Sequence, residues 1–284
     1  MSVSMLCRSV LYIPGSKKRA LIKALTLPVD AIIIDLEDAV AASEKEAARS
    51  TLAAQLASED YGHRLKIVRI NGLDTDWGVS DAKAVAQMQA DAVLLPKAEN
   101  VEQIDALDAL TPGLPIWCMM ETPLGILNAA EIARHKSVDG FVMGTNDLAK
   151  DIGCVTGGDR LAMMTSLQLC ILAARAAGIA CVDGVYNAFK DEDGLRAECD
   201  QGLALGMDGK SLIHPAQVEI SNTVFAPDAA SIELARRHIA AFEEAEAQGE
   251  GVAVVDGSIV ENLHVVTARM VLSKAHAIEK RTKS

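Results

Sequence analysis

Residues 116–148 read IWCMMETPLGILNAAEIARHKSVDGFVMGTNDL, and they contain the repeating unit from which the fold can be predicted. It opens with a continuous apolar run, passes through an amphipathic segment and closes with a second apolar run. Continuous rather than alternating apolar runs are typical of strands in a parallel sheet, because helices cover both faces of such a sheet. The stretch therefore predicts one strand–helix–strand unit.

The same pattern recurs from the start of the chain to about position 220. Helix-like segments such as EKEAARSTLAAQLA and LAMMTSLQLCILAARAAG separate the apolar runs. The predicted strands are residues 9–15, 31–38, 65–71, 92–99, 116–123, 140–148, 179–187 and 209–215. Eight parallel strands alternating with helices close a (β/α)8, or TIM, barrel, which we predict over residues 1–225. An open doubly wound sheet is the alternative, but the G-x-G-x-x-G signature of its dinucleotide-binding members is absent after the first run.

Residues 226–284 have a different character and form a predicted C-terminal helical/β extension. A charged amphipathic helix is expected over 229–247, a glycine-flanked β-like excursion over 248–262 and a last helix over 263–280. A barrel does not need these elements. They would form either a lid on their own barrel or an arm that crosses to a neighbouring subunit, and the sequence leaves both open.

Composition excludes several classes of protein. The net charge of −12 argues against nucleic-acid binding and against a polybasic membrane surface. No stretch approaches the roughly 20 apolar residues that span a bilayer, and the N-terminus does not resemble a signal peptide. The six cysteines form no C-x-x-C pair, which favours free thiols in a reducing compartment. We expect a soluble cytoplasmic protein.

Two acids follow the apolar runs of the opening stretch, Glu121 and Asp147. The carboxyl ends of barrel strands form the reaction face, so both carboxylates are expected in one cleft. Carboxylate oxygens suit Mg²⁺, which retains several waters and needs few protein ligands. The sequence therefore predicts a Mg²⁺ site, and the alternative is a pair of helix-capping or loop acids. A zinc site is not expected, because the six histidines are scattered.

Arg69 ends the third run with apolar residues before it. Burying a guanidinium is costly unless it meets an anion, which would be a protein carboxylate such as Asp35 or a substrate carboxylate. Lys97 follows the fourth run and would serve a rival Schiff-base mechanism. The acids on the neighbouring runs favour the metal site over that rival.

Several short motifs together resemble one family. They are RSVLYIPG (8–15), DLEDAV (35–40), VRIN (68–71), LPK (95–97), METPLG (120–125) and GTNDL (144–148). In this order they resemble the citrate lyase β-subunit-like (CitE-like) family of the HpcH/HpaI aldolase superfamily, which is related to malyl-CoA and citramalyl-CoA lyases. The resemblance implies a (β/α)8 barrel, a Mg²⁺ ion, acyl-CoA and 2-oxo acid substrates, and homo-oligomers that are trimers or hexamers.

The resemblance also assigns roles at the metal. Glu121 and Asp147 match the Mg²⁺ ligands of the family, and Glu121 would lie beside the bound substrate. Glu37 and Asp38 fall where the family has acids around the metal-bound waters.

Two arginines and one acid complete the predicted site by resemblance. Arg69 matches the arginine that holds the keto-acid carboxylate, and Arg8 matches an arginine near the same pocket. Relatives deliver a general acid/base aspartate from an adjacent subunit, and that position falls on Glu261 in this chain. The extra methylene of glutamate moves the proton-transfer atom. Asp256 in the same segment is the alternative carboxylate.

Three functions follow from this reading. The first is a Mg²⁺-dependent carbon–carbon lyase that cleaves or forms a malyl-CoA or citramalyl-CoA type of hydroxyacyl-CoA. The second is a thioesterase on the same scaffold. The third is a citrate lyase β subunit that acts on an acyl-carrier protein within a complex.

Overall fold

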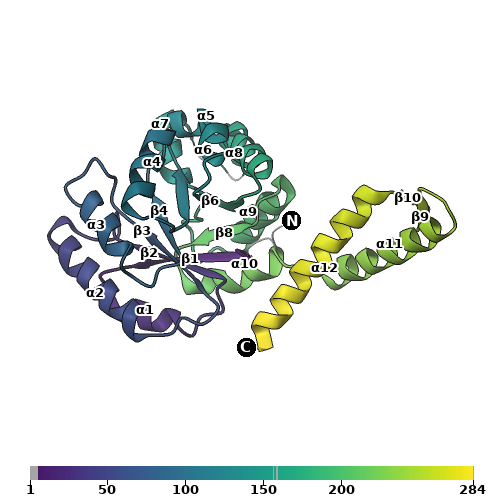
Figure 1. The fold of residues 1–284 in the computed structure, drawn as a ribbon, viewed down its shortest axis with the longest axis horizontal. Coiled ribbons are helices and arrows are strands. Elements are labelled where there is room, and N and C mark those ends of the chain that lie inside the picture. The colour runs from purple at the N-terminus through teal and green to yellow at the C-terminus, as the bar shows by residue number, and fades with distance from the viewer. Residues whose placement is uncertain (1–5, 156, 158, 284) are drawn as a thin grey trace. The chain divides into compact units, whose positions relative to one another are not determined.

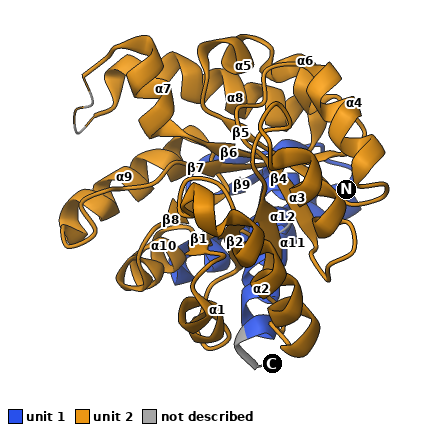
Figure 2. Ribbon diagram, turned by 90° about the vertical axis from the view of Figure 1, so that its left-hand side faces the viewer, with its two compact units in different colours: residues 1–6, 226–284 blue, residues 7–225 orange. Residues whose placement is uncertain are grey.

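The computed structural model describes residues 6–155, 157 and 159–283. The chain divides into two compact units (Figure 2). The larger unit is Cys7–Phe225, and the smaller unit comprises Met1–Leu6 and Ala226–Ser284.

The larger unit is a closed barrel of eight parallel strands in sequential order (Figure 1). The strands are β1 (Ser9–Pro14), β2 (Ala31–Asp35), β3 (Leu65–Arg69), β4 (Ala92–Leu95), β5 (Ile116–Met120), β6 (Val138–Met143), β7 (Ala180–Asp183) and β8 (Gly209–Leu212). The predicted (β/α)8 barrel is confirmed.

Helices connect the strands and cover the outside of the barrel (Figure 1). They are α1 (Lys18–Ala24), α2 (Lys45–Ser58), α3 (Gly78–Val85), α4 (Val101–Leu110), α5 (Pro123–Leu127), α6 (Ala129–Ala133), α7 (Thr145–Ile152), α8 (Met164–Ala177), α9 (Glu192–Leu205) and α10 (Val218–Val224). Three short 3-10 helices accompany them, η1 (Ala42–Glu44), η2 (Leu161–Met163) and η3 (Pro215–Gln217).

The continuous apolar runs are buried on both strand faces, as expected of a parallel sheet. In β2 the side chains of Ile32, Ile33 and Ile34 are all inaccessible to solvent although they alternate between faces. One set faces the barrel interior and the other packs under the helices. This double burial explains why the strands lack polar positions until they end.

The predicted strands begin within two residues of the observed ones but extend one to five residues too far at their carboxyl ends. The surplus residues lie in the loops and first helical turns at the reaction face, such as Leu36 after β2 and Glu121 after β5. These residues are buried like strand residues. Burial alone therefore does not distinguish the strand from the loop that follows it.

The smaller unit contains α11 (Ala229–Ala247), β9 (Ala253–Val255), β10 (Ser258–Val260) and α12 (Asn262–Lys283). β9 and β10 pair antiparallel around Asp256 and Gly257, whose positive φ angles of 50° and 80° suit a two-residue hairpin turn. Val255, Val260 and Val265 belong to a small apolar cluster beside the hairpin. Among the described residues, no helix has the length and apolar character needed to cross a membrane.

Candidate active site at the carboxyl end of the barrel

Glu121 follows β5 directly, and its side chain is only 1% exposed. Its Oε1 accepts a hydrogen bond of 2.9 Å from the backbone N–H of Lys97 after β4. Burial raises the pKa of Glu121 to about 7, against the lowering effect of that hydrogen bond. A cation beside the carboxylate would favour the charged form.

Gly144 makes room for Glu121 at the end of β6. A Cβ at position 144 would collide with Cβ and Oε2 of Glu121. Gly144 donates its N–H to the carbonyl of Met120, so the two strand ends lie against each other. A glycine is needed here for close approach rather than for its backbone angles, since φ is −98°.

Lys97 has two contacts with the site. Its φ of 47° lies in the left-handed region, which is strained for a residue with a side chain. Its backbone N–H donates to Glu121, and its Nζ lies 3.0 Å from Oε1 of Glu37. Lys97 therefore links the acids that follow β2 and β5.

Asp147 lies in the first turn of α7, three residues after Gly144, and is half-buried. Within the described part of the chain, its carboxylate has no hydrogen bond or ion pair. Glu121 and Asp147 thus belong to adjoining strand–loop junctions, and each keeps carboxylate oxygens free of strong partners. No cluster of three or more His, Cys, Asp or Glu side chains is arranged for a metal in the described ranges. A cation here would take two protein ligands and complete its shell with water or substrate, as predicted for Mg²⁺.

Arg69, at the end of β3, is held by a bidentate pair with Asp35. Its Nε and Nη2 each donate a 2.7 Å hydrogen bond to one oxygen of Asp35. Its Nη1 lies 3.0 Å from Glu37 and 3.4 Å from Asp38. The structure therefore includes the protein-carboxylate partner expected of Arg69, and Nη1 is the nitrogen that meets the further acids Glu37 and Asp38.

Tyr12 of β1 is a site residue that the sequence analysis missed. Its ring lies 5.2 Å from the Arg69 guanidinium, and its hydroxyl donates to the sulfur of Met119 at 3.2 Å. It therefore reaches from β1 across the barrel interior to β5. A phenol within an otherwise apolar run was the available signal, because a buried hydroxyl needs a partner.

Acidic groups outnumber basic groups at this end of the barrel. Four carboxylates interact with two cations, and the six residues are Asp35, Glu37, Asp38, Glu121, Arg69 and Lys97. Burial raises the pKa of Glu37, and the nearby Arg69 charge acts against that rise. This surplus negative charge suits a bound divalent cation.

A second layer of polar residues holds the Glu37 loop from behind. Lys45 of α2 donates to the carbonyls of Leu36 and Glu37 and to Oδ1 of Asn71, at 2.6 to 3.1 Å. Asn71 in turn donates to Asp81 of α3. No pattern in the sequence predicts this layer, because it depends on how α2 and α3 pack on the barrel.

Arg8 does not join this group, and its predicted place near the pocket is wrong. It precedes β1, so it lies at the amino end of the barrel. There its Nε and Nη2 bond both oxygens of Asp30 at 2.9 Å. A residue before the first position of a strand faces the end opposite the reaction face.

Glu261 lies in the smaller unit, between β10 and α12. Its backbone N–H donates to Nδ1 of His264, and its side chain is exposed. The alternative acid, Asp256, is paired at 2.7 Å with Arg237 of the same unit. Of the two carboxylates, Glu261 is therefore the one without an ion pair in the described part of the chain.

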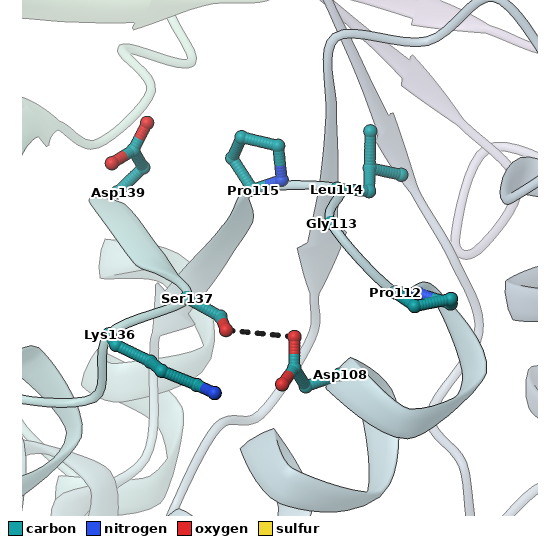
Figure 3. Close-up of a pocket in the computed structure, with 8 residues that line it drawn as sticks. All are labelled: Asp108, Pro112, Gly113, Leu114, Pro115, Lys136, Ser137 and Asp139. Carbon is teal, nitrogen blue, oxygen red and sulfur yellow. Dashed lines mark hydrogen bonds between the residues drawn. The ribbon is translucent and has the colours of Figure 1, made fainter.

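A surface depression lies at the other end of the barrel, away from these residues. It measures about 440 Å³, and Figure 3 shows its lining side chains from the loops before β5 and β6. Lys136 and Asp139 lie on its rim, and Ser137 donates a hydrogen bond to Asp108. The amino end of a TIM barrel contributes to stability rather than to catalysis.

The barrel with an acidic carboxyl end is the arrangement of a metal-dependent barrel enzyme. A family model described as HpcH/HpaI aldolase/citrate lyase matches residues 8–215, and the chain belongs to this family. The resemblance drawn from the short motifs is confirmed.

Among curated proteins, the chain is 64% identical over 271 residues to a (3S)-malyl-CoA thioesterase of Cereibacter sphaeroides, with 95% of each chain covered. It is 35% identical over 282 residues to the citrate lyase subunit beta of Leuconostoc mesenteroides, covering 95% of this chain and 93% of the other. A solved structure of CitE from Mycobacterium tuberculosis in complex with magnesium, acetoacetate and coenzyme A matches with a TM-score of 0.82 and 28% identity. That match covers 95% of this chain and 98% of the other.

Proposed function

We propose that this protein is a Mg²⁺-dependent thioesterase that hydrolyses a hydroxyacyl-CoA of the (3S)-malyl-CoA type. The 64% identity to a (3S)-malyl-CoA thioesterase over 95% of both chains carries the proposal. The surplus of carboxylates at the carboxyl end of the barrel supports it, because such a surplus suits a bound divalent cation.

Glu121 and Asp147 would hold the Mg²⁺ ion. Both supply hard oxygen donors, Asp147 has no competing ion pair in the described ranges, and the neighbouring acids exceed their cations. Structures of related proteins contain magnesium, which agrees with this donor set. When bound, the ion would act as a Lewis acid toward a substrate oxygen.

Arg69 would bind the terminal carboxylate of the malyl group through Nη1. Its other edge is already fixed by Asp35, so the guanidinium is oriented before substrate arrives. Glu37 and Asp38, which now face Nη1, would turn to the waters around the metal. The cation–π contact of Arg69 with the Tyr12 ring, at 5.2 Å from the centroid, would further restrict the guanidinium.

Hydrolysis requires a base for the attacking water, and we assign this role to Glu261. The water oxygen would attack the thioester carbonyl carbon, the carbon–sulfur bond would break, and the released thiolate would take up a proton. By resemblance, the carboxylate would come from an adjacent subunit of a trimer or hexamer. The molar mass of the purified protein, measured by light scattering, tests whether it forms a trimer or hexamer.

Two variants of this residue test the assignment. Glu261→Gln should lower kcat by about 10²-fold or more, since general base catalysis contributes roughly that much. Glu261→Asp installs the shorter acid of the lyase relatives and should raise carbon–carbon cleavage relative to hydrolysis. Unchanged kcat in Glu261→Gln would remove Glu261 from the mechanism.

The lyase is the second candidate, because the family and the citrate lyase subunit beta relatives favour carbon–carbon cleavage. Purified protein with Mg²⁺ and (3S)-malyl-CoA or citramalyl-CoA distinguishes the two when free thiol and 2-oxo acid are assayed together. A thioesterase releases thiol and an intact hydroxy-diacid. A lyase releases 2-oxo acid and keeps the thioester as a shorter acyl-CoA. If neither free thiol nor 2-oxo acid is released, the next substrates to assay are thioesters of an acyl-carrier protein.

We also propose a cytoplasmic location. All six cysteines are free, and five of them are buried, which fits a reducing compartment.

A further inference from the structure

Glu261, the base in the proposed function, lies where α12 begins, between two buried valines. Val260 precedes it at the end of β10, and Val265 follows it in the first turns of α12. The two valines are 0% and 2% exposed, and both belong to the apolar cluster of the smaller unit. A pair of apolar residues on the two sides of a helix start fixes the direction in which the chain enters the helix. The path of the backbone through Glu261 is therefore well defined.

The backbone of Glu261 is also held by hydrogen bonds on both sides of its Cα atom. Its carbonyl accepts from the N–H groups of His264 and Val265, at 2.9 and 3.3 Å. Its own N–H donates to Nδ1 of the His264 side chain at 3.0 Å. Because the donor is a backbone N–H, Nδ1 is the ring nitrogen that carries no proton. His264 thus fixes Glu261 with its side chain as well as with its backbone.

This side-chain bond is one half of a capping box, and the other half is missing. In a complete box, the side chain of the residue before the helix accepts from the N–H of the third helical residue. Here that N–H belongs to His264 and goes to the backbone carbonyl of Glu261. In the described part of the chain, the Glu261 carboxylate has no hydrogen bond or ion pair, and the residue is exposed. The helix start is capped while the acid stays available for another role.

A second imidazole supports the ring of His264. Helices α11 and α12 pack along each other (Figure 1), and His238 of α11 meets His264. The two ring centroids are 6.3 Å apart, and the planes are inclined at 81°. Aromatic rings in this edge-to-face arrangement attract each other. The contact favours the orientation of His264 in which Nδ1 points to Glu261.

We propose that His264 is a positioning residue for the general base, because its Nδ1 holds the N–H of Glu261 and so determines where the carboxylate is presented. This inference rests on the proposed function, since it concerns the base assigned there. His264 transfers no proton in the reaction and acts only through Glu261. The effect belongs in kcat rather than in KM, because the carboxylate acts on the attacking water and not on the bound thioester.

Two substitutions of His264 isolate its hydrogen bond. His264→Gln retains an acceptor, since glutamine at the third helical position makes the same half of a capping box. His264→Ala removes the acceptor. His276→Ala is the matched control, because it makes the same change on α12 at a position remote from the start of the helix. Steady-state kinetics with (3S)-malyl-CoA gives kcat and KM of each variant, and circular dichroism confirms that each is folded.

His264→Ala should lower kcat about 10- to 100-fold with little change in KM, since a shift of about 1 Å in a reacting group can cost about 10²-fold. His264→Gln should stay within about threefold of the wild-type kcat, because it keeps the capping bond. His276→Ala should leave both constants unchanged. A wild-type kcat in His264→Ala, or a loss in His264→Gln as large as that in His264→Ala, would overturn the proposal.

A double variant tests whether His264 acts through the carboxylate. Adding His264→Ala to Glu261→Gln should lower kcat no further, because the group that His264 positions is already lost. If the second substitution lowered kcat by the same factor as in the wild-type background, His264 would act independently of Glu261 and the proposal would be wrong.

Failure of the proposed function would be seen separately, as no thioester turnover by the wild type or as an unchanged kcat in Glu261→Gln. In that case hydrogen exchange of the Glu261 amide tests the contact itself. Exchange about fivefold faster in His264→Ala than in the wild type supports the positioning of Glu261 by His264, since a hydrogen bond contributes about that factor. His264→Gln should exchange like the wild type. Equal rates in the wild type and His264→Ala refute the inference.

Discussion

The barrel carries an arginine–aspartate pair at each end. Arg8 and Asp30 bond at 2.9 Å at the amino end, and Arg69 and Asp35 bond at 2.7 Å at the carboxyl end. Both pairs are bidentate and join neighbouring strands, and both aspartates are buried. Two such similar pairs show that the geometry of a pair does not reveal whether it serves catalysis.

The difference lies in what surrounds each pair. Arg69 also meets Glu37 and Asp38, and Glu121 lies close enough to interact with it. Arg8 has Asp30 as its recorded acidic partner in the described part of the chain. A charge-balanced pair fastens two strands, whereas a pair within a surplus of acids can be reorganised by a cation or a substrate.

Removing a metal ligand should have the largest effect. Asp147→Asn or Glu121→Gln should lower kcat/KM on the order of 10³-fold, because the Lewis-acid stabilisation is worth several kcal/mol. Asp139→Asn is the control at the amino end, where an exposed acid should contribute nothing. Steady-state kinetics with saturating Mg²⁺ provides the comparison, and equal losses in Asp139→Asn would contradict the contrast between the two ends.

Arg8→Met and Arg69→Met break the two pairs directly. Each takes the arginine from a buried aspartate, which should cost about 3–5 kcal/mol in the free energy of unfolding measured in urea. Only Arg69→Met should also abolish turnover by the folded enzyme at a permissive temperature. Arg69→Lys should restore charge without the bidentate geometry and so recover little activity. If Arg8→Met impaired kcat/KM as much as Arg69→Met, the assignment of Arg8 to the structural end would be wrong.

Gly144→Ala tests how tightly the metal side is packed. The new Cβ would push Glu121 aside, so Mg²⁺ affinity and kcat/KM should fall about 10- to 100-fold, as for lost support of a metal ligand. Gly251→Ala is a matched control, because its Cβ would meet no atom within 4 Å and its φ is not positive. If the Gly144→Ala variant bound Mg²⁺ as tightly as the wild type does, Glu121 would not be held in place by its contact with Gly144.

The carboxyl-end pair should also make stability depend on pH in acid. Burial would raise the pKa of Asp35, but the hydrogen bonds and charge of Arg69, with backbone N–H groups of Glu37 and Ala39, hold it below its ordinary value. A lowered folded-state pKa contributes stability above the unfolded value of about 3.9, and that contribution is lost as pH falls through the folded value.

Urea unfolding between about pH 5 and pH 2 measures this term. Asp35→Asn should reduce the slope of the unfolding free energy against pH by up to about 1.4 kcal/mol per pH unit in the lower part of that range. An unaltered slope in the variant would mean that Asp35 binds protons equally in the folded and unfolded states.

The barrel could be predicted from the sequence because eight apolar runs recur at regular intervals. The carboxyl-end residues could also be predicted, because the ends of the strands converge there. They are Glu121, Asp147, Arg69 and Glu37. Arg8 was misplaced because the resemblance was followed instead of the residue's place before its strand. The left-handed backbone of Lys97 could not be predicted, since it depends on the packing of β4 against β5.

A second buried charge cluster also escaped the sequence analysis. Asp183 of β7 bonds Arg160 at 2.7 Å and lies 3.2 Å from Lys210 of β8. Lys210 lies on β8, and nothing in the sequence relates it to Arg160, which is 50 residues away. Long-range ion pairs of this kind appear only when the register of β7 and β8 is known.

Calorimetric titration of metal-free protein with MgCl₂ measures whether the acids at the carboxyl end bind a cation, and the surplus of these acids is what distinguishes the two ends of the barrel. We predict one Mg²⁺ per chain in the wild type and in Asp139→Asn, and no binding in Asp147→Asn. A wild type that binds no Mg²⁺, or an Asp147→Asn variant that binds it as tightly as the wild type, would contradict the account.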